Sequence, residues 1–163
     1  MSAPLQQGQP ATAASEVYCV LLPLAEERLL LPRACVLEVV NYHAPTPMVS
    51  APPWYRGTIP WGGRQVPVVS FEACCGRSIP EPSGRTRIVL LHSLTADAAP
   101  IGILAQGFPQ HVRVAADVLK GDDSRVFGER VPVICQVRMI SEYPLIPDLE
   151  RLEQMIGEET RVA

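Results

Sequence analysis

Residues 55–71 read YRGTIPWGGRQVPVVSF and carry the strongest structural signal in the chain. Two runs, Tyr55–Trp61 and Arg64–Phe71, are rich in β-branched and aromatic residues, and Gly62 and Gly63 separate them. A two-residue glycine turn between such runs is typical of a β-hairpin, because glycine readily adopts the positive φ angles that this turn needs. The stretch therefore predicts two antiparallel strands that meet at Gly62–Gly63.

Further short extended runs lie on both sides of this hairpin. The 17 prolines among 163 residues disfavour long helices and favour short strands joined by turns. The segments Gln65–Val69 and Arg130–Ile134 resemble each other, which favours two related β units. The pattern predicts a mainly β fold with other strands at Val17–Leu24, Arg28–Leu31, Arg87–Leu94, Ile101–Ala105, His111–Val114 and Val131–Met139.

Two helices are expected among these strands. Pro32 fits the first turn of a short internal helix through Leu37, where its missing N–H costs nothing. Near the end of the sequence, Asp148 is a suitable N-cap for an amphipathic helix that ends at Gly157. The remaining segments are predicted to be a helical turn at Ala115–Leu119 and loops at Asn41–Pro53, Cys74–Gly84 and Lys120–Ser124.

The composition changes along the chain suggest a division into three parts. Residues 1–15 are rich in Ala, Gln, Pro, Ser and Thr without an apolar period, which is typical of a flexible tail. We expect one domain over residues 16–157 and a short C-terminal tail over residues 158–163.

The charge and hydropathy of the chain argue against two classes of partner. The formal net charge is −3 and the isoelectric point is near 5.6, so the chain lacks the basic surface that nucleic-acid binding requires. No apolar run approaches the roughly 18 residues of a membrane span, and the start of the chain has no secretory signal. We therefore expect a cytoplasmic protein without nucleic-acid binding or direct membrane insertion.

The reactive side chains do not assemble into a catalytic or metal-binding motif. The five cysteines are scattered and form no C-x-x-C pair, and the three histidines stand in unrelated contexts. No glycine-rich phosphate loop is present. The sequence thus predicts a protein that is not an enzyme and has no cofactor and no metal site.

Three segments together resemble the CheW-like family of chemotaxis coupling domains. Gly57–Gly63 followed by Val66–Phe71 is similar to the family signature, in which Gly, two apolar residues, Asn, Leu and Arg-Gly lead into a Pro-Val strand ending in Asp-Leu. Val36–Val40 is similar to the family's Val-x-Glu-Ile-Ile segment. Weaker similarity extends through Ile101–Gln106 and Val131–Val137, so the resemblance covers roughly residues 16–157.

The resemblance implies a fold and a function. The family fold consists of two intertwined five-stranded β-barrels, small barrels of the SH3-like or OB-like kind, with a C-terminal helix. Family members are non-catalytic adaptors that hold a CheA-type histidine kinase to the cytoplasmic tip of a methyl-accepting chemoreceptor. One barrel contacts the regulatory domain of the kinase, and a groove between the barrels receives the receptor.

Carried over to this sequence, the resemblance gives a set of candidate partner-binding residues. Gly57 would allow a close backbone approach, Trp61 and Val66 would supply apolar contact, and Glu38 would set orientation by its charge. The full candidate set is Val36, Glu38, Arg56, Gly57, Trp61, Gly63 and Val66.

This chain also departs from the family pattern at four positions. Gly62 stands where the family has Arg, Pro60 where it has Asn, and Ser70 and Gln106 where it has Asp. Because the family Arg is thought to pair with the glutamate at position 38, we expect Glu38 to be solvated or to meet Arg56 or Arg64. The departures suggest a divergent accessory member of a type IV pilus or twitching-motility chemosensory system.

Two alternatives from other functional classes remain open on the sequence. Cys74 or Cys75 could be a thiol nucleophile or redox switch, which requires a nearby cation such as Arg77 to lower the thiol pKa. Alternatively, the protein could bind oligonucleotides, because small barrels of this kind can stack bases on aromatic side chains. The acidic isoelectric point argues against this hypothesis.

Overall fold

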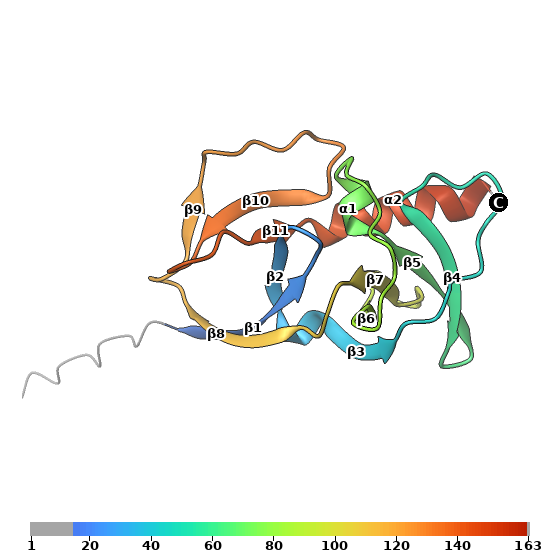
Figure 1. The fold of residues 1–163 in the computed structure, drawn as a ribbon, viewed down its shortest axis with the longest axis horizontal. Helices are drawn as coiled ribbons and strands as arrows, with labels where there is room; N and C mark the ends of the chain where they lie inside the picture. Colours follow the sequence, from blue (N-terminus) through green and yellow to red (C-terminus); the bar gives the residue numbers. More distant parts are fainter. Residues whose placement is uncertain (1–14, 163) are drawn as a thin grey trace, which may run out of the picture.

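The fold is known from a computed structural model that describes residues 15–162. All but the last residue of the predicted N-terminal tail therefore lies outside the described residues. Two sheets lie side by side, and α2 begins beside β11 and runs along the second sheet (Figure 1). The elements are β1 (Glu16–Pro23), β2 (Arg28–Pro32), the 3-10 helix η1 (Arg33–Cys35), β3 (Val36–Asn41), β4 (Tyr55–Trp61), β5 (Arg64–Val69), α1 (Phe71–Cys74), β6 (Arg87–Leu91), β7 (Ile101–Ala105), β8 (Gln110–Ala115), β9 (Lys120–Asp122), β10 (Val133–Arg138), β11 (Leu145–Pro147) and α2 (Leu149–Val162).

The first sheet has six strands in the order β8-β1-β2-β11-β10-β9. The predicted strands at Val17–Leu24 and Arg28–Leu31 are confirmed as the antiparallel hairpin of β1 and β2. The polar turn between them closes with a hydrogen bond of 2.8 Å from the Leu24 N–H to the Glu27 carbonyl oxygen. Strand β11 then joins β2 in parallel at Leu145 and Leu29, which brings the C-terminal part of the chain against its beginning.

The second sheet has five strands in the order β3-β6-β7-β5-β4. The predicted hairpin is confirmed, because β4 and β5 pair in antiparallel fashion from Tyr55 and Val69 up to Trp61 and Arg64. Gly62 and Gly63 form its turn with φ angles of 56° and 75°, the left-handed values that the glycine pair predicts. Strand β5 also pairs in parallel with β7 and so lies inside the sheet.

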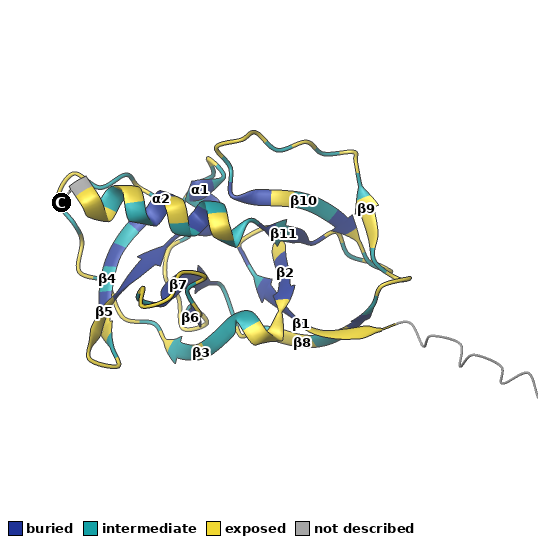
Figure 2. Cartoon of the chain, turned by 180° about the vertical axis from the view of Figure 1, so that it is seen from behind, coloured by how far each residue is buried: buried dark blue, intermediate teal, exposed yellow. Residues whose placement is uncertain are grey.

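Three apolar clusters fill the molecule. The central cluster joins β1, β2, β10 and β11 of the first sheet to β5, β6 and β7 of the second, and Leu152, Met155 and Ile156 of α2 belong to it. One smaller cluster belongs to each sheet alone, around Ile59 and Val66 in the second and around Leu21 and Val137 in the first. Buried and exposed residues alternate along α2 as one of its faces packs on this core (Figure 2). The two sheets therefore share one hydrophobic core.

Several sequence predictions need correction. The helix predicted at Pro32–Leu37 is only the 3-10 turn Arg33–Cys35, because Val36 already pairs with Leu91 of β6. The internal α-helix is instead α1, at the point where the second hairpin strand was expected to continue. Helix α2 does not end at Gly157 but continues to Val162, and Gly157 lacks the positive φ angle of a C-cap.

The predicted start of α2 is confirmed, whereas the first sheet contains strands that were not predicted. Asp148 caps α2 as expected, since its Oδ1 accepts a 3.0 Å hydrogen bond from the Arg151 N–H. The first sheet has six strands where five were expected, because the predicted loop at Lys120–Ser124 contains β9, which pairs with β10. Segment Leu145–Pro147 forms the strand β11, which sequence analysis did not predict.

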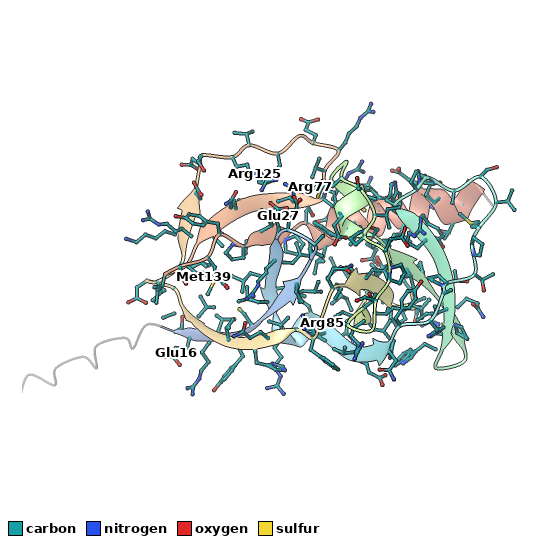
Figure 3. All side chains as sticks on the ribbon, in the orientation of Figure 1. Glu16, Glu27, Arg77, Arg85, Arg125 and Met139 are labelled. Atoms are coloured by element: carbon teal, nitrogen blue, oxygen red, sulfur yellow. The ribbon has the colours of Figure 1, made fainter. Side chains whose placement is uncertain are left out.

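A charged cluster fastens three loops where the sheets meet. Glu27 in the β1–β2 turn pairs with Arg125 of the β9–β10 loop and, at 3.5 Å, with Arg77 after α1. Arg77 also pairs with Glu26 at 2.9 Å. Glu27, Arg77 and Arg125 point toward one another (Figure 3). Because these loops come from different parts of the chain, the cluster ties the turn of the first sheet to the helix that follows the second hairpin.

Candidate partner-binding surface

The two outer strands of the second sheet meet through a hydrogen bond between side chains. β3 and β4 stand at opposite ends of the strand order. Nevertheless, the Trp61 Nε1–H of β4 donates a 2.7 Å hydrogen bond to Glu38 Oε2 of β3. The sheet therefore curls until its edges face each other, as the predicted barrel requires, and two of the candidate residues lie in contact.

Arg56 and Arg64, the expected partners of Glu38, form their hydrogen bonds with backbone carbonyl oxygens instead. Arg56 Nη1 donates to the Pro53 carbonyl oxygen at 3.2 Å. Arg64 donates to the carbonyl oxygens of Asp97 at 2.6 Å and Ala98 at 3.3 Å. Of the two expected alternatives, the pairing of Glu38 with Arg56 or Arg64 is therefore wrong. Glu38 is solvent-exposed, as the other alternative states, and it accepts a hydrogen bond from the indole N–H of Trp61. Nothing in the sequence marks this contact, because Glu38 and Trp61 are 23 residues apart.

Gly57 lies at an irregularity of the hairpin and under a loop. The pairing of β4 with β5 shifts register between Tyr55 and Gly57, which places Arg56 in a β-bulge. Gly57 has a φ angle of 122°, and a Cβ atom there would lie 2.1 Å from the Thr46 carbonyl oxygen. The close backbone approach at Gly57 is thus made by the chain's own loop, which is bridged to Thr58.

Four residues at the open end of the second sheet form what we call the hairpin face: Glu38, Trp61, Gly62 and Gly63. Glu38 and both glycines are exposed, and Trp61 is half-buried against the cluster of the second sheet. A Cβ atom on Gly62 or Gly63 would meet no atom within 4 Å. The hairpin face is therefore open surface with a fixed carboxylate at its edge.

The two candidate valines occupy other environments. Val66 is fully buried among Ile59, Val68 and Leu90, so it supports the hairpin face from below and offers no exposed contact surface. Val36 is half-buried against the central cluster that the two sheets share. It therefore lies at the junction of the sheets and apart from the hairpin face.

Ser70 and Glu72 make internal contacts that sequence analysis missed. Ser70 Oγ accepts from the Ala73 N–H at 3.3 Å and caps α1, so this departure from the family aspartate still supplies a capping oxygen. Glu72 is buried, and its Oε1 accepts a 3.1 Å hydrogen bond from the Ala25 N–H in the β1–β2 turn. A Ser-x-Glu pattern directly after a strand was the available signal for this capped turn.

At the fourth departure, Gln106, a backbone contact joins the two sheets. The Gln106 N–H donates a 2.8 Å hydrogen bond to the carbonyl oxygen of Pro23, which ends β1 of the first sheet. Because a backbone group makes this contact, the change from the family aspartate leaves it intact.

The two adjacent cysteines do not have the environment of a reactive thiol. Burial, followed by the charges of Cys75 and Glu72, raises the pKa of Cys74 from 9.0 to about 12. Burial and the charge of Glu27 raise the pKa of Cys75 from 9.0 to about 11, although Arg77 and Arg125 act to lower it. The lowered thiol pKa that the nucleophile hypothesis requires is therefore absent at both residues.

This thiol environment gives a pH-dependent prediction. At pH 8 we expect iodoacetamide to alkylate Cys75 roughly a hundred times more slowly than free cysteine, because two pH units separate the thiol pKa values. The raised pKa stabilises the folded chain below pH 9, and this contribution should be lost as the pH rises through about 11. Mass-resolved alkylation and urea unfolding at several pH values measure both effects. A rate equal to that of free cysteine would contradict the assignment.

The hydrogen bond between Glu38 and Trp61 can be measured by a double-mutant cycle. We expect Trp61→Phe and Glu38→Gln to be coupled by about 1 kcal/mol in urea unfolding, since the first removes the donor of this hydrogen bond and the second removes the negative charge that strengthens its acceptor. Trp54→Phe is the matched control, because Trp54 packs on the central cluster away from Glu38. Coupling of Glu38→Gln to the control as strong as to Trp61→Phe would show that the hydrogen bond is not its source.

These observations define a class of protein: a β module of two sheets, one of them curled, that presents surface side chains and exposed turns. Among residues 15–162, no three side chains of the metal-ligating types lie together. In that part of the chain, no helix has the length and apolar character needed to cross a membrane.

Comparison with known proteins identifies the family. Residues 18–154 match the CheW-like domain. The structure is similar to the crystal structure of the scaffolding protein TtCheW from Thermoanaerobacter tengcongensis, with a TM-score of 0.70 and 18% sequence identity over 88% of this chain and 91% of that chain. No curated protein matches the sequence. The chain belongs to the CheW-like domain family, which confirms the predicted fold class and makes the protein a CheW-like scaffold in chemotaxis signalling.

Proposed function

We propose that this protein is a non-catalytic cytoplasmic adaptor that couples the tip of a methyl-accepting chemoreceptor to the regulatory domain of a CheA-type histidine kinase. The observation that carries the proposal is the hydrogen bond from Trp61 to Glu38 at the open end of the second sheet. It joins residues that the family resemblance assigns to partner binding, and it lies on exposed surface.

The hairpin face is the surface that we assign to the kinase. Trp61 holds one oxygen of the Glu38 carboxylate, and among the described residues Glu38 forms no ion pair. A fixed carboxylate without a cationic partner favours a protein that presents an Arg or Lys side chain. Gly62 and Gly63 add no side-chain bulk, so a partner backbone can approach the turn closely.

We assign the receptor to the junction between the sheets. Val36 lies there, half-buried against the central cluster. An apolar side chain at the edge of a shared core is suited to contact a helical receptor tip through its apolar face. In this arrangement one partner contacts the end of the second sheet and the other contacts both sheets, so a single rigid module fixes their relative positions.

We further propose that the protein is an accessory member of a type IV pilus or twitching-motility chemosensory system. The support is the change in the hairpin, where Gly62 and Pro60 replace the family Arg and Asn and Trp61 takes over the contact with Glu38. This exchange removes a cation from the hairpin face and would change which kinase is accepted, because charges at an interface act mainly on specificity.

Affinity capture with purified partners tests the proposal. We expect the folded protein to retain both the kinase regulatory domain and the receptor tip encoded beside its own gene at micromolar concentration. Glu38→Arg should weaken kinase retention at least about tenfold, since it reverses the charge that the hairpin face presents, and leave receptor retention unchanged. Glu129→Arg makes the same charge change on an exposed loop of the first sheet and is the control. Failure of the folded protein to retain either partner would refute the adaptor function.

A further inference from the structure

A groove runs along α2 on the outer side of the second sheet, and none of the four residues of the hairpin face lines it. Its walls are α2 and the β6–β7 loop, and β4 and β5 form its floor together with the start of β7. Its volume is about 1010 Å³. Neither the family resemblance nor the proposed adaptor function assigns a role to this groove.

The loop wall of the groove is held in place by two charged side chains from different elements. Glu153 of α2 accepts hydrogen bonds from the Leu94 N–H at 2.9 Å, the Thr95 N–H at 3.2 Å and the Ser93 hydroxyl. Burial opposes ionisation of Glu153, but these hydrogen bonds outweigh it and lower its pKa. At the other end of the loop, Arg64 donates to two backbone carbonyl oxygens. The groove is therefore preformed and needs little ordering when a ligand binds.

The groove combines a partly apolar lining with an acidic rim. Tyr55 and Ile101 of the floor and Ile156 of the α2 wall are buried apolar residues, and Leu94 of the loop wall contributes an exposed apolar side chain with 60% accessibility. Thr58 and Gln65 add polar side chains to the floor. On α2, the exposed Glu150 and Glu158 line the groove, and Glu158 also pairs with Arg151 at 4.0 Å. Among the lining residues the acidic side chains are Glu150, Glu153 and Glu158, and the only basic one is Arg161.

A further carboxylate acts on a residue of the floor, because burial and, after it, the charge of Glu159 raise the pKa of Tyr55. Acidic side chains thus outnumber basic ones along the groove, which disfavours an acidic segment and favours a basic one.

We propose that this groove docks a short basic segment of another protein, with one or two apolar side chains on the floor and flanking Arg or Lys side chains at the acidic rim. Charge complementarity selects the basic occupant. The α2 residues from Glu150 to Arg161 span about 16 Å at 1.5 Å per residue, which matches about five residues of extended chain. The chain's own first 14 residues contain no Lys or Arg and do not fit this requirement.

This docking surface goes beyond the adaptor function. It lies on the outer wall of the second sheet, whereas the hairpin face lies at its open end and Val36 at the junction of the sheets. A segment held in the groove would leave the proposed kinase and receptor surfaces free. The groove would therefore recruit an additional protein to the adaptor.

Peptide titrations followed by amide NMR spectra of the full chain test the proposal. The probes are three capped pentapeptides: Arg-Leu-Arg-Leu-Arg, Glu-Leu-Glu-Leu-Glu and Arg-Ser-Arg-Ser-Arg. We expect only the first to give saturable shifts at low salt, and we expect these shifts at Leu94, Ala98 and Gly157. The acidic peptide lacks the charge complementarity, and the serine peptide lacks the apolar anchors.

Paired variants separate specific docking from general attraction. Glu150→Gln combined with Glu158→Gln should lower the affinity for the first peptide at least about fivefold, because two exposed charge contacts are lost. Glu81→Gln combined with Glu129→Gln removes the same charge from exposed loops elsewhere and should leave binding unchanged. The proposal would be overturned if both pairs weakened peptide binding equally, or if the shifts centred on Glu38 and Trp61. It would also be overturned if binding did not saturate at millimolar peptide, or if the free chain formed a dimer that buries the groove. Kinase and receptor capture remain independent of all these results.

Discussion

Gly57→Ala is expected to lower the free energy of unfolding by about 3 kcal/mol or more. The φ angle of 122° is one that only glycine adopts without strain, which alone costs about 1–3 kcal/mol for another residue. The added Cβ would also lie 2.1 Å from the Thr46 carbonyl oxygen, so the Thr46 loop must move. That movement breaks the hydrogen bonds of 2.8 Å and 3.0 Å between Thr46 and Thr58, each worth about 1 kcal/mol. Urea unfolding followed by tryptophan fluorescence measures the loss.

Two other glycines are matched controls for this prediction. Gly62→Ala has a positive φ angle of 56° but no atom within 4 Å of the new Cβ, so only conformational strain of about 1 kcal/mol is expected. Gly84→Ala has neither strain nor a neighbour and should change stability by less than about 0.5 kcal/mol. If Gly57→Ala costs no more than Gly62→Ala, the contact with Thr46 does not constrain this position.

The elements that sequence analysis located correctly are those with local causes. The Gly62–Gly63 turn fixes the β4–β5 hairpin because both strands and the turn lie within 17 residues. Asp148 marks the start of α2 for the same reason, since a cap acts on residues three positions away. In each case the residues that form the contact are close in the sequence, so a short sequence motif is enough to predict the element.

The elements that it missed depend on distant partners. Strand β9 consists of Lys120, Gly121 and Asp122, which have low strand preference, and it forms because β10 lies beside it. Strand β11 contains only three residues, and its neighbours are β10 and β2. Pairing with neighbouring strands therefore gives these segments their extended conformation, although their residues have a low intrinsic preference for it.

In the candidate site, too, features with local causes were predicted and features that depend on distant residues were not. Gly63 was placed at an exposed turn by its local motif, and the structure places it there. The contact of Glu38 with Trp61 joins opposite edges of a five-stranded sheet, so its geometry follows from how far the sheet curls. Val66 was assigned a contact role on resemblance, yet the alternation along β5 turns its side chain into the core.

The shared central cluster has a consequence for how an adaptor holds two partners. If each sheet folded around its own core, the two proposed partner surfaces could move relative to each other, because small interfaces between domains permit such motion. Here residues of both sheets and α2 pack into one cluster. The sheets should therefore unfold together and keep the hairpin face fixed relative to the junction at Val36.

Leu152→Ala tests this rigidity and should destabilise both sheets at once. Leu152 is fully buried in α2 within the central cluster. Its truncation leaves a cavity, and we expect a loss of about 2–5 kcal/mol. In a Trp54→Phe background, Trp61 fluorescence reports on the second sheet, and amide exchange of Leu22 and Leu29 reports on the first. Both signals should move to lower urea concentration together, because one cooperative transition loses the same free energy wherever it is observed.

The control for Leu152→Ala is Ile134→Ala, which removes a comparable apolar side chain from β10 at a position that is 63% exposed. It should change stability by less than about 0.5 kcal/mol, since little buried surface is lost. If Leu152→Ala instead separates the fluorescence transition from the amide-exchange transition, the sheets unfold as independent units. Relative motion of the hairpin face and the junction would then be possible in the folded protein, and a rigid module could not be how the adaptor fixes its partners.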